Sequence, residues 1–242
     1  MTGRDPGVGR PIDLGASGVT KRLGAFARHH PLRGERLLDL GCGNGAYTSV
    51  LALTYDRVDA VDPTPAHLEQ FRASMPADVA DRITLHEGAG EDLGFDDATF
   101  DTVTCIEVLE HVRSVPATVA EVHRVLRPGG AFLVTVPNRG FPFETHLVTV
   151  GSRTFPGRRL PGLPWVPPLH ARWSDARIYS ARTLRAAVEP AGFRTVAIDY
   201  VMPPFDRWEA GRRFVRPVTE RLEKSPAKAL GVSVVGVFVK QG

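Results

Sequence analysis

The sequence predicts an α/β fold in which helices cover both faces of a doubly wound, mostly parallel β-sheet. Residues 37–40 form a short apolar segment typical of a buried strand, and a glycine-rich turn follows directly. A second apolar segment, residues 58–62, ends in an acid, Asp62, about twenty residues later. Further strand-length apolar segments alternate with helical patterns. A strand, a glycine-rich turn, a helix and an acid-ending strand are typical of the nucleotide-binding half of such a sheet.

The turn after the first strand carries three glycines, Gly41, Gly43 and Gly45. Glycine lets the backbone turn sharply and lets a ligand approach bare main chain. The helix expected from about residue 44 to 54 would point unpaired N–H groups at that ligand. The spacing is G-x-G-x-G rather than G-x-G-x-x-G, and the sequence has no G-x-x-x-x-G-K-[ST] phosphate loop. Both features favour a nucleoside ligand without a pyrophosphate.

Residues 1–35 are interpreted as an N-terminal arm and helix. Residues 1–18 hold several Gly and Pro residues and should form a flexible arm over the ligand site. Residues 19–30 carry apolar side chains at helical spacing, including Val19, Leu23 and Phe26. We expect this helix to lie across the sheet edge.

The core elements follow in order along residues 36–242, which we expect to form one domain. After Asp62, Pro63 and Thr64 lead into a helix with Leu68 and Phe71 on its buried face. The further strands are expected at residues 83–87, 100–105, 131–136, 193–201 and 230–239. The further helices are expected at residues 116–126 and 180–191, with a basic helical insertion at 206–226.

Residues 138–180 form an unusually long connection, rich in Pro, Gly, Arg and aromatic residues. Its length is far above that of an ordinary loop, which favours a functional lid. We interpret this segment as a substrate cap inserted after the fifth strand. Its arginines could clamp an acidic substrate, touch an anionic membrane surface or simply solvate a loop. They are Arg153, Arg158, Arg159, Arg172 and Arg177.

Composition is typical of a globular protein: 43% of the 242 residues are hydrophobic and 24% are charged. The net charge of +3 comes without a dense basic recognition module, so nucleic acid is not an expected partner. Cys42 and Cys105 are too few for a disulfide framework and should be buried thiols. We expect a cytoplasmic protein, because neither a span of about 20 apolar residues nor a signal peptide is evident. The expected state is a monomer or homodimer.

Four motifs in order resemble the class I S-adenosylmethionine-dependent methyltransferases. They are LLDLGCGNGAYT, AVDPTPAHLEQFRA, GAGEDLGFDDATFDTVTCIEVLEHV and EVHRVLRPGGAFLVTVPN, which together cover close to half of the chain. The CIEVLEHV and TVPN segments are most similar to quinone-biosynthesis O-methyltransferases. The resemblance implies a Rossmann-like sheet of seven strands in the order 3-2-1-4-5-7-6, with the last strand antiparallel.

The resemblance also implies S-adenosylmethionine as the cofactor and S-adenosylhomocysteine as the product. Asp39 would hold the amino end of the cofactor directly or through water, and Asp62 would take the ribose hydroxyls. The region from Gly90 to Asp92 would lie beside the adenine, but whether Glu91 or Asp92 meets it stays open. The other implied cofactor residues are Gly41, Cys42, Gly43, Pro63, Ile106 and Glu107, the last two near the reactive methyl.

Methyl transfer from a sulfonium requires alignment, exclusion of water and, for a hydroxyl, an acceptor for the proton. Histidine suits the last task because its ordinary pKa is about 6.5. His146 is the first catalytic candidate and His111 the second, a structural role being the alternative for each. The candidate substrate-binding residues are Glu144, His170 and Tyr179. The other histidines are expected at the surface: His29, His30, His67, His86 and His123.

Glu107, Glu110 and His111 resemble a metal cluster, and some quinone-pathway methyltransferases use a divalent ion. At helical spacing they cannot all face one ion, so no metal is predicted. The predicted function is methylation of a small molecule at a hydroxyl of a sugar, polyketide, lipid or quinone-like acceptor. The alternatives are transfer to nitrogen or carbon of a natural product and a non-catalytic, cofactor-binding partner protein.

Overall fold

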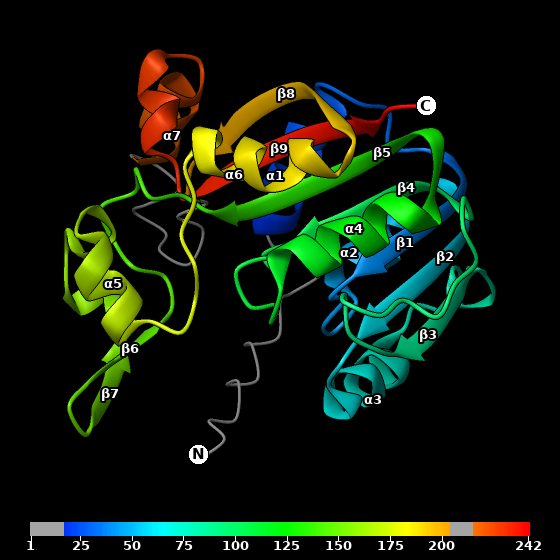
Figure 1. Ribbon diagram of the computed structural model, residues 1–242, viewed down its shortest axis with the longest axis horizontal. Helices are drawn as coiled ribbons and strands as arrows, with labels where there is room; N and C mark the ends of the chain where they lie inside the picture. Colours follow the sequence, from blue (N-terminus) through cyan, green and yellow to red (C-terminus); the bar gives the residue numbers. More distant parts are fainter. Residues whose placement is uncertain (1–16, 204–214) are drawn as a thin grey trace.

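A seven-stranded mixed sheet is the centre of the computed structural model, which describes residues 17–203 and 215–242 (Figure 1). The strand order is β3-β2-β1-β4-β5-β9-β8. Strands β1 to β5 pair in parallel, whereas β9 runs antiparallel to both of its neighbours. Numbered along the chain within this sheet, the order is 3-2-1-4-5-7-6, and the predicted topology is confirmed.

The sheet strands are β1 (Gly34–Leu40), β2 (Tyr55–Asp62), β3 (Ile83–Glu87), β4 (Phe100–Ile106), β5 (Leu126–Pro137), β8 (Phe193–Val201) and β9 (Ser233–Lys240). The helices outside the cap are α1 (Ser17–Ala27), α2 (Ala46–Leu51), α3 (Pro65–Ser74), α4 (Val115–Val125), α6 (Ala181–Val188) and α7 (Arg216–Glu223). Short 3-10 helices include η1 (Ala80–Arg82), η4 (Glu189–Ala191) and η6 (Pro226–Leu230).

Both faces of the sheet are covered, which is why its strands are continuous apolar segments in the sequence. Leu37 packs in the layer that contains residues of α1, α2 and α3, and Leu38 packs in the opposite layer with α4 and α6. Figure 1 shows α4 and α6 on the near face of the sheet and α1 behind it. Because successive strand residues point to opposite faces, two adjacent leucines anchor both layers.

Some element ends differ from the prediction. Helix α2 begins only at Ala46, because Gly45 takes a left-handed φ of 78° before it. Strand β5 begins at Leu126 rather than at residue 131, because Leu126 pairs with Phe100 across an irregular register. Residues 1–16 of the predicted arm and residues 204–214, which include the start of the predicted insertion, lie outside the described residues.

The cap has its own secondary structure, which the sequence pattern did not predict. It contains the antiparallel hairpin β6 (Leu147–Val150) and β7 (Arg153–Pro156), helix α5 (Pro167–Trp173), and the 3-10 helices η2 (Gly157–Arg159) and η3 (Leu163–Trp165). Figure 1 shows the cap apart from the sheet, beyond the carboxyl end of β5. The strands have four residues each, too short for a clear period in the sequence.

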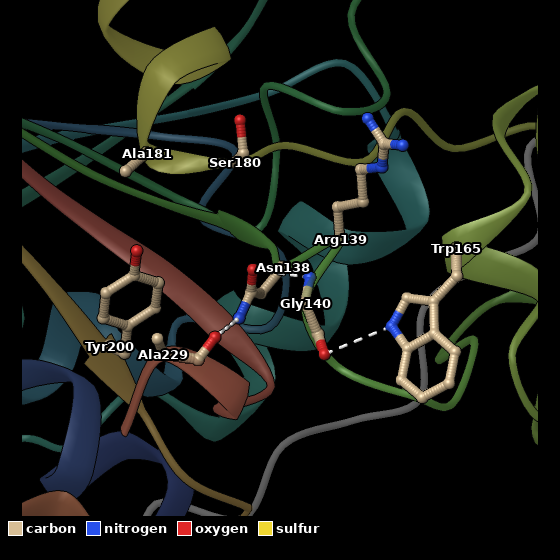
Figure 2. Close-up of a pocket in the computed structure, with 8 residues that line it drawn as sticks. All are labelled: Asn138, Arg139, Gly140, Trp165, Ser180, Ala181, Tyr200 and Ala229. Carbon is tan, nitrogen blue, oxygen red and sulfur yellow. Dashed lines mark hydrogen bonds between the residues drawn. The ribbon is translucent and has the colours of Figure 1, made fainter. Parts of the chain in front are cut away.

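Asn138 ties the base of the cap to the sheet. Its Nδ2 donates to the carbonyl oxygens of Ala229 and Gly231 at 2.8 and 2.7 Å, and its Oδ1 accepts from Gly140 N at 2.9 Å (Figure 2). At the other end of the cap, Tyr179 N donates to the Pro137 carbonyl at 2.9 Å. The cap therefore leaves and rejoins the sheet at one place.

Asp199 on β8 fixes α1 to the far edge of the sheet. Asp199 is only 3% exposed. Its carboxylate binds Arg28 Nη2 at 2.8 Å, His29 Nε2 at 3.1 Å and Lys228 Nζ at 2.8 Å. Burial opposes ionisation, but the bonds from Lys228, Arg28 and His29 outweigh it and lower the pKa of Asp199. Arg28 and His29, just after α1, and Lys228 of η6 thus converge on one buried carboxylate.

Replacing Asp199 by Asn should lower the free energy of unfolding by on the order of 2 kcal/mol at pH 7, less than for a fully buried pair because Arg28 is half exposed. A carboxylate whose pKa is lower in the folded than in the unfolded state stabilises the fold at pH values above the ordinary Asp pKa of about 4. This stabilisation is lost progressively as the pH falls below that value. Urea unfolding should therefore show a smaller difference at pH 3.5 than at pH 7. Equal differences at both values would contradict this role, and the exposed Asp78→Asn serves as control.

Candidate functional site

The carboxyl ends of β1, β2 and β4 lie at one edge of the sheet. Leu40 pairs with Val61 of β2 on one side and with Cys105 of β4 on the other, so the segments that follow these strands start side by side. The chain order of the strands reverses between β1 and β4. Open α/β sheets bind ligands outside the carboxyl ends of their strands at such a reversal.

The three glycines of the turn after β1 have positive φ and different surroundings. The φ values of Gly41, Gly43 and Gly45 are 75°, 53° and 78°. A Cβ on Gly41 would lie 2.2 Å from Val108, and one on Gly45 would lie 2.1 Å from the ring of Phe71. A Cβ on Gly43 would meet nothing within 4 Å. Gly41 and Gly45 are thus required for packing, whereas Gly43 leaves open space for a ligand.

Asp62, at the end of β2, reaches the glycine turn and does not point into the core. Its Oδ2 accepts from Gly43 N at 2.9 Å, and its Oδ1 accepts from Thr64 N at 2.9 Å. His67 Nδ1 lies 3.0 Å from the same Oδ1, with 17% of the His67 side chain exposed. The predicted surface position of His67 is therefore wrong, because its ring packs against this carboxylate. Pro63 is exposed beside it.

Asp39 supports the strand ends from inside the protein. The residue is 2% exposed, its Oδ2 accepts from Thr48 Oγ1 at 2.6 Å, and its Oδ1 accepts from Thr104 Oγ1 at 2.8 Å. Burial raises the pKa of Asp39 although both hydroxyls oppose the shift. Because both oxygens already accept a hydroxyl, contact with a ligand stays a prediction. Cys42 and Cys105 are free and buried as predicted, and burial raises the pKa of both thiols.

The acids predicted beside the adenine have different surroundings. Glu91 Oε1 accepts the backbone N–H groups of Arg113 and Ser114 at 2.6 and 3.1 Å, which supports the start of α4. Asp92 is exposed, and its carboxylate accepts no hydrogen bond from the described residues. Gly90 is buried, where a Cβ would press on Thr118 at 2.9 Å. Asp92 is thus the acid that remains available to a base.

Glu107 follows the end of β4 in a strained conformation. Its φ is 56°, rare for a residue other than glycine, and its N–H donates to the Thr135 carbonyl at 3.0 Å. Its Oε1 lies 3.5 Å from Arg22 Nε on α1. Arg22 Nη2 also donates to Ser233 Oγ at 3.1 Å. The neighbouring Ile106 is 7% exposed and closes β4.

Arg22 is a site residue that sequence reasoning missed. Burial disfavours its charge, but Glu107 and Tyr47 more than compensate and raise the pKa of the guanidinium. The signal was present in the sequence, since Arg22 lies at helical spacing from the buried Val19 and Phe26. A charged residue on the apolar face of a helix needs a buried partner, and here the partner is Glu107.

The cap brings His146 to the end of β4 beside His111. The two rings lie 5.1 Å apart, and their Nε2 atoms lie 3.9 Å (His146) and 4.0 Å (His111) from Oε1 of Glu110. Glu110 is fully buried and neither of its oxygens has a hydrogen-bond partner among the described residues. Burial, together with the nearby charge of Glu107, raises the pKa of Glu110 well above its ordinary range. The two predicted catalytic histidines thus meet at one buried carboxyl group.

His111 is the more exposed of the two histidines. Its side chain is 49% exposed, compared with 21% for His146. Burial of the ring and the neighbouring His146 lower the pKa of His111 to about 4. The imidazole of His111 is therefore neutral at physiological pH, and a nitrogen lone pair of the ring can accept a hydrogen bond or bind a cation.

Glu144 holds two histidines of the cap. It accepts from His146 N and from His146 Nδ1, both at 2.8 Å, and from His170 Nε2. Burial opposes ionisation of Glu144, but the bonds from His146 and His170 outweigh it and lower its pKa. Glu144 and His170 are each 2% exposed. They support His146 from behind, which differs from the direct substrate contact predicted for them.

Tyr179 also differs from its predicted role at the substrate. It is 6% exposed, and its hydroxyl donates to the Leu109 carbonyl at 3.3 Å. Burial raises the pKa of Tyr179 to about 12. Its ring closes the base of the cap against the segment after β4.

Glu110, His111 and His146 could together hold a metal ion. One ligand atom from each lies within 4.8 Å of the others. Glu107, Glu110 and His111 were not expected to face one ion, and Glu107 indeed points toward Arg22. The third ligand of the cluster is instead His146, which comes from the cap. Carboxylate and imidazole ligands suit several divalent transition metals. The cluster thus fits either a cation or acid–base chemistry.

A shallow pocket of about 400 Å³ opens where the cap meets the sheet. Figure 2 shows Trp165 and Tyr200 on opposite sides of Asn138, with the Arg139 guanidinium extending above them. The pocket borders the base of the cap, and none of its lining residues belongs to the glycine turn or the histidine cluster. It offers two aromatic rings and a cation beside the site.

The chain matches a family model described as a methyltransferase domain over residues 38–134. It is 32% identical to a demethylmenaquinone methyltransferase of Symbiobacterium thermophilum, the match covering 64% of this chain and 62% of that protein. It is 30% identical to a ubiquinone biosynthesis O-methyltransferase of Azorhizobium caulinodans, over 76% of this chain and 69% of that one. The chain thus spans less than two thirds of the first relative.

A solved structure of an S-adenosylmethionine-dependent methyltransferase from Mesorhizobium loti has the same fold. It superposes with a TM-score of 0.65 at 19% identity, covering 91% of this chain and 98% of that chain. At this identity the likeness concerns the fold alone.

The open space at Gly43 predicts a contrast between two alanine variants. Gly43→Ala keeps the N–H that binds Asp62. It should lower the free energy of unfolding by only about 1–2 kcal/mol, the cost of a positive φ at alanine. Its Cβ nevertheless enters the space proposed for the ligand. Gly45→Ala adds overlap with Phe71, which should cost about 1–3 kcal/mol more. Urea unfolding and calorimetric titration with S-adenosylhomocysteine measure both. A folded Gly43→Ala variant that binds like the wild type would contradict the ligand position.

Proposed function

The chain belongs to the class I S-adenosylmethionine-dependent methyltransferases, and we propose that it transfers the cofactor methyl group to a hydroxyl oxygen of a small molecule. The family and cofactor expected from the four motifs are confirmed. The observation that carries the proposal is the pair Glu144–His146, which the cap places beside His111 at the end of β4. The relatives named for ubiquinone and menaquinone metabolism support a quinone-like or other hydroxylated acceptor.

We propose that the cofactor lies across the glycine turn. The bare backbone at Gly43 would take the adenosyl group and Asp62 the ribose hydroxyls. At the other end, Arg22 and Glu107 form a pair of opposite charges, which suits the carboxylate and ammonium of the methionine part. The exposed Asp92 remains for the adenine amine.

In the proposed reaction the acceptor oxygen attacks the methyl carbon, the carbon–sulfur bond breaks, and its electron pair stays on sulfur as a neutral thioether. The hydroxyl proton passes to His146 Nε2. Glu144 accepts a hydrogen bond from Nδ1–H of His146, which fixes the tautomer that leaves Nε2 free to accept. The neutral His111 lies beside this nitrogen and can orient the hydroxyl.

The same cluster supports metal assistance as a second possibility. The buried, unpartnered oxygens of Glu110, with the nitrogens of His111 and His146, fit a divalent cation. A bound cation would supply Lewis-acid stabilisation of the acceptor oxygen as it loses its proton.

His146→Ala should lower kcat about a hundredfold on a hydroxylated acceptor, because a positioned base contributes this much. The affinity for S-adenosylhomocysteine should stay unchanged, since His146 belongs to the cap. Glu144→Gln should lower kcat by about tenfold through the loss of tautomer control. His123→Ala, in the last turn of α4, is the control.

Single-turnover assays with calorimetry measure these effects. An unchanged rate for His146→Ala would contradict the base, and cofactor binding without turnover on any acceptor would favour the non-catalytic alternative. Turnover of amines or carbon acceptors alone would favour N- or C-methylation. Activity that is lost in EDTA and restored by Mn²⁺ or Zn²⁺ would replace the base mechanism by the metal one.

We further propose that the cap docks on an anionic membrane surface, where a lipid-like acceptor resides. Residues 138–180 contain six arginines and two acids, and one of these acids, Glu144, is buried. Trp165 at the end of η3 and Leu169 and Arg172 on α5 are all exposed. Exposed Trp and Leu beside arginines suit the interface of an anionic bilayer.

This docking would be peripheral. Within residues 17–203 and 215–242, no helix combines the length and apolar character that crossing a bilayer requires. We place the enzyme in the cytoplasm, which agrees with two free thiols. The predicted monomeric or homodimeric state stays a prediction.

Flotation with phosphatidylglycerol-containing vesicles tests the docking surface. The wild type should float with anionic vesicles at low salt and be released by high salt. The variant Trp165→Ala/Leu169→Ala should bind roughly tenfold more weakly because it loses two apolar contacts. Leu53 is as exposed as Trp165 but lies just after α2, outside the cap, so Leu53→Ala should float like the wild type. Absence of the wild type from the anionic vesicles, or unchanged flotation of the double variant, would contradict this surface.

A further inference from the structure

His67 lies beside the proposed ribose site, although the sequence predicted only a surface position for it and no role in binding. The residue belongs to the first turn of α3, and its Nδ1 lies 3.0 Å from Oδ1 of Asp62. The His67 side chain is 17% exposed and that of Asp62 is 7% exposed. His67 is thus a largely buried neighbour of the carboxylate that would receive the ribose.

Helix α3 is held against the glycine turn at two points. His67 and Phe71 are four residues apart and share one face of the helix. Phe71 fills the space in which a Cβ on Gly45 would lie, and His67 reaches Asp62. The helix begins with Pro65, and Thr64 N donates to the same oxygen of Asp62 at 2.9 Å. The packing of Phe71 therefore fixes where the His67 ring stands.

The hydrogen-bond pattern assigns the tautomer of His67. A carboxylate oxygen only accepts hydrogen bonds, so the facing Nδ1 carries the proton. Nε2 is then an acceptor, and it is buried without a partner among the described residues. A ring needed only for packing would bury no unpaired nitrogen, because that burial is unfavourable. The ring is therefore present for the bond from Nδ1.

The two oxygens of Asp62 are held differently. Oδ1 accepts from both Thr64 N and His67 Nδ1, whereas Gly43 N is the one donor to Oδ2 within residues 17–203 and 215–242. A carboxylate oxygen has about two acceptor positions, so Oδ2 keeps one for a ligand hydroxyl. With Oδ1 fixed by two donors, Oδ2 cannot rotate away from the glycine turn.

We propose that His67 is a positioning residue for the cofactor ribose, acting by holding the Asp62 carboxylate in the orientation that meets the ribose hydroxyls. This inference rests on the cofactor position given under the proposed function. It requires no protonation change, and it does not depend on the identity of the methyl acceptor.

Paired titrations test the proposal with S-adenosylhomocysteine and its 2′,3′-dideoxyribose analogue. His67→Phe keeps the ring and removes the donor, so it should weaken binding of S-adenosylhomocysteine about tenfold and binding of the analogue very little. His67→Asn places an N–H near the position of Nδ1 and should restore most of the loss. A purely structural role would instead weaken both ligands equally, and that result, or no loss at all, would overturn the proposal.

His86→Phe is the matched control. His86 Nε2 lies 2.7 Å from Oδ1 of Asp59, another acid of β2, and this pair lies away from the glycine turn. It should bind both ligands like the wild type, and urea unfolding should show all variants folded. If the wild type binds neither ligand, the proposed cofactor site fails and this inference with it. If the wild type binds both ligands equally well, only the contact between Asp62 and the ribose is overturned, and with it the role of His67.

Discussion

The hydrogen bond from Gly43 N–H to the Asp62 carboxylate joins the turn after β1 to the end of β2, and the site depends on it. The turn can present this N–H only because its glycines adopt positive φ, and β2 can present the acid only because its register places Val61 beside Leu40. Two further bonds, from Gly41 N and Cys42 N to the Val61 carbonyl, hold the same junction. The ends of β1 and β2 therefore present bare backbone at Gly43 beside the carboxylate of Asp62.

Charged side chains near the carboxyl ends of these strands are paired across distant elements, as burial requires. Arg22 of α1 meets Glu107 after β4, and Glu144 of the cap accepts from both His146 and His170. Glu110 differs from these residues, because both of its carboxyl oxygens lack a hydrogen-bond partner among the described residues and its pKa is raised. A buried acid between two histidines, without hydrogen-bond partners among the described residues, is a candidate functional position, and it lies where the cap meets the end of β4.

The strands, the glycine turn and Asp62 could be predicted because strand period and backbone conformation are local properties of the sequence, whereas the sheet order came from the resemblance to a known family. The partners of buried side chains could not. Arg22 was visible only as a charge on an apolar helix face, and His67 only as one of several unassigned histidines. The internal structure of the cap was missed since its strands are four residues long. His146 and His111 were predicted as separate candidates, and only the structure shows that their two rings lie together.

A crystal structure with S-adenosylhomocysteine measures the central relation most directly. We expect the adenosyl group to lie against Gly43, with at least one ribose hydroxyl bound to the Asp62 carboxylate and the homocysteine end near Arg22 and Glu107. Electron density for the nucleoside elsewhere on the molecule, or a bound nucleoside whose ribose makes no contact with Asp62, would contradict that arrangement.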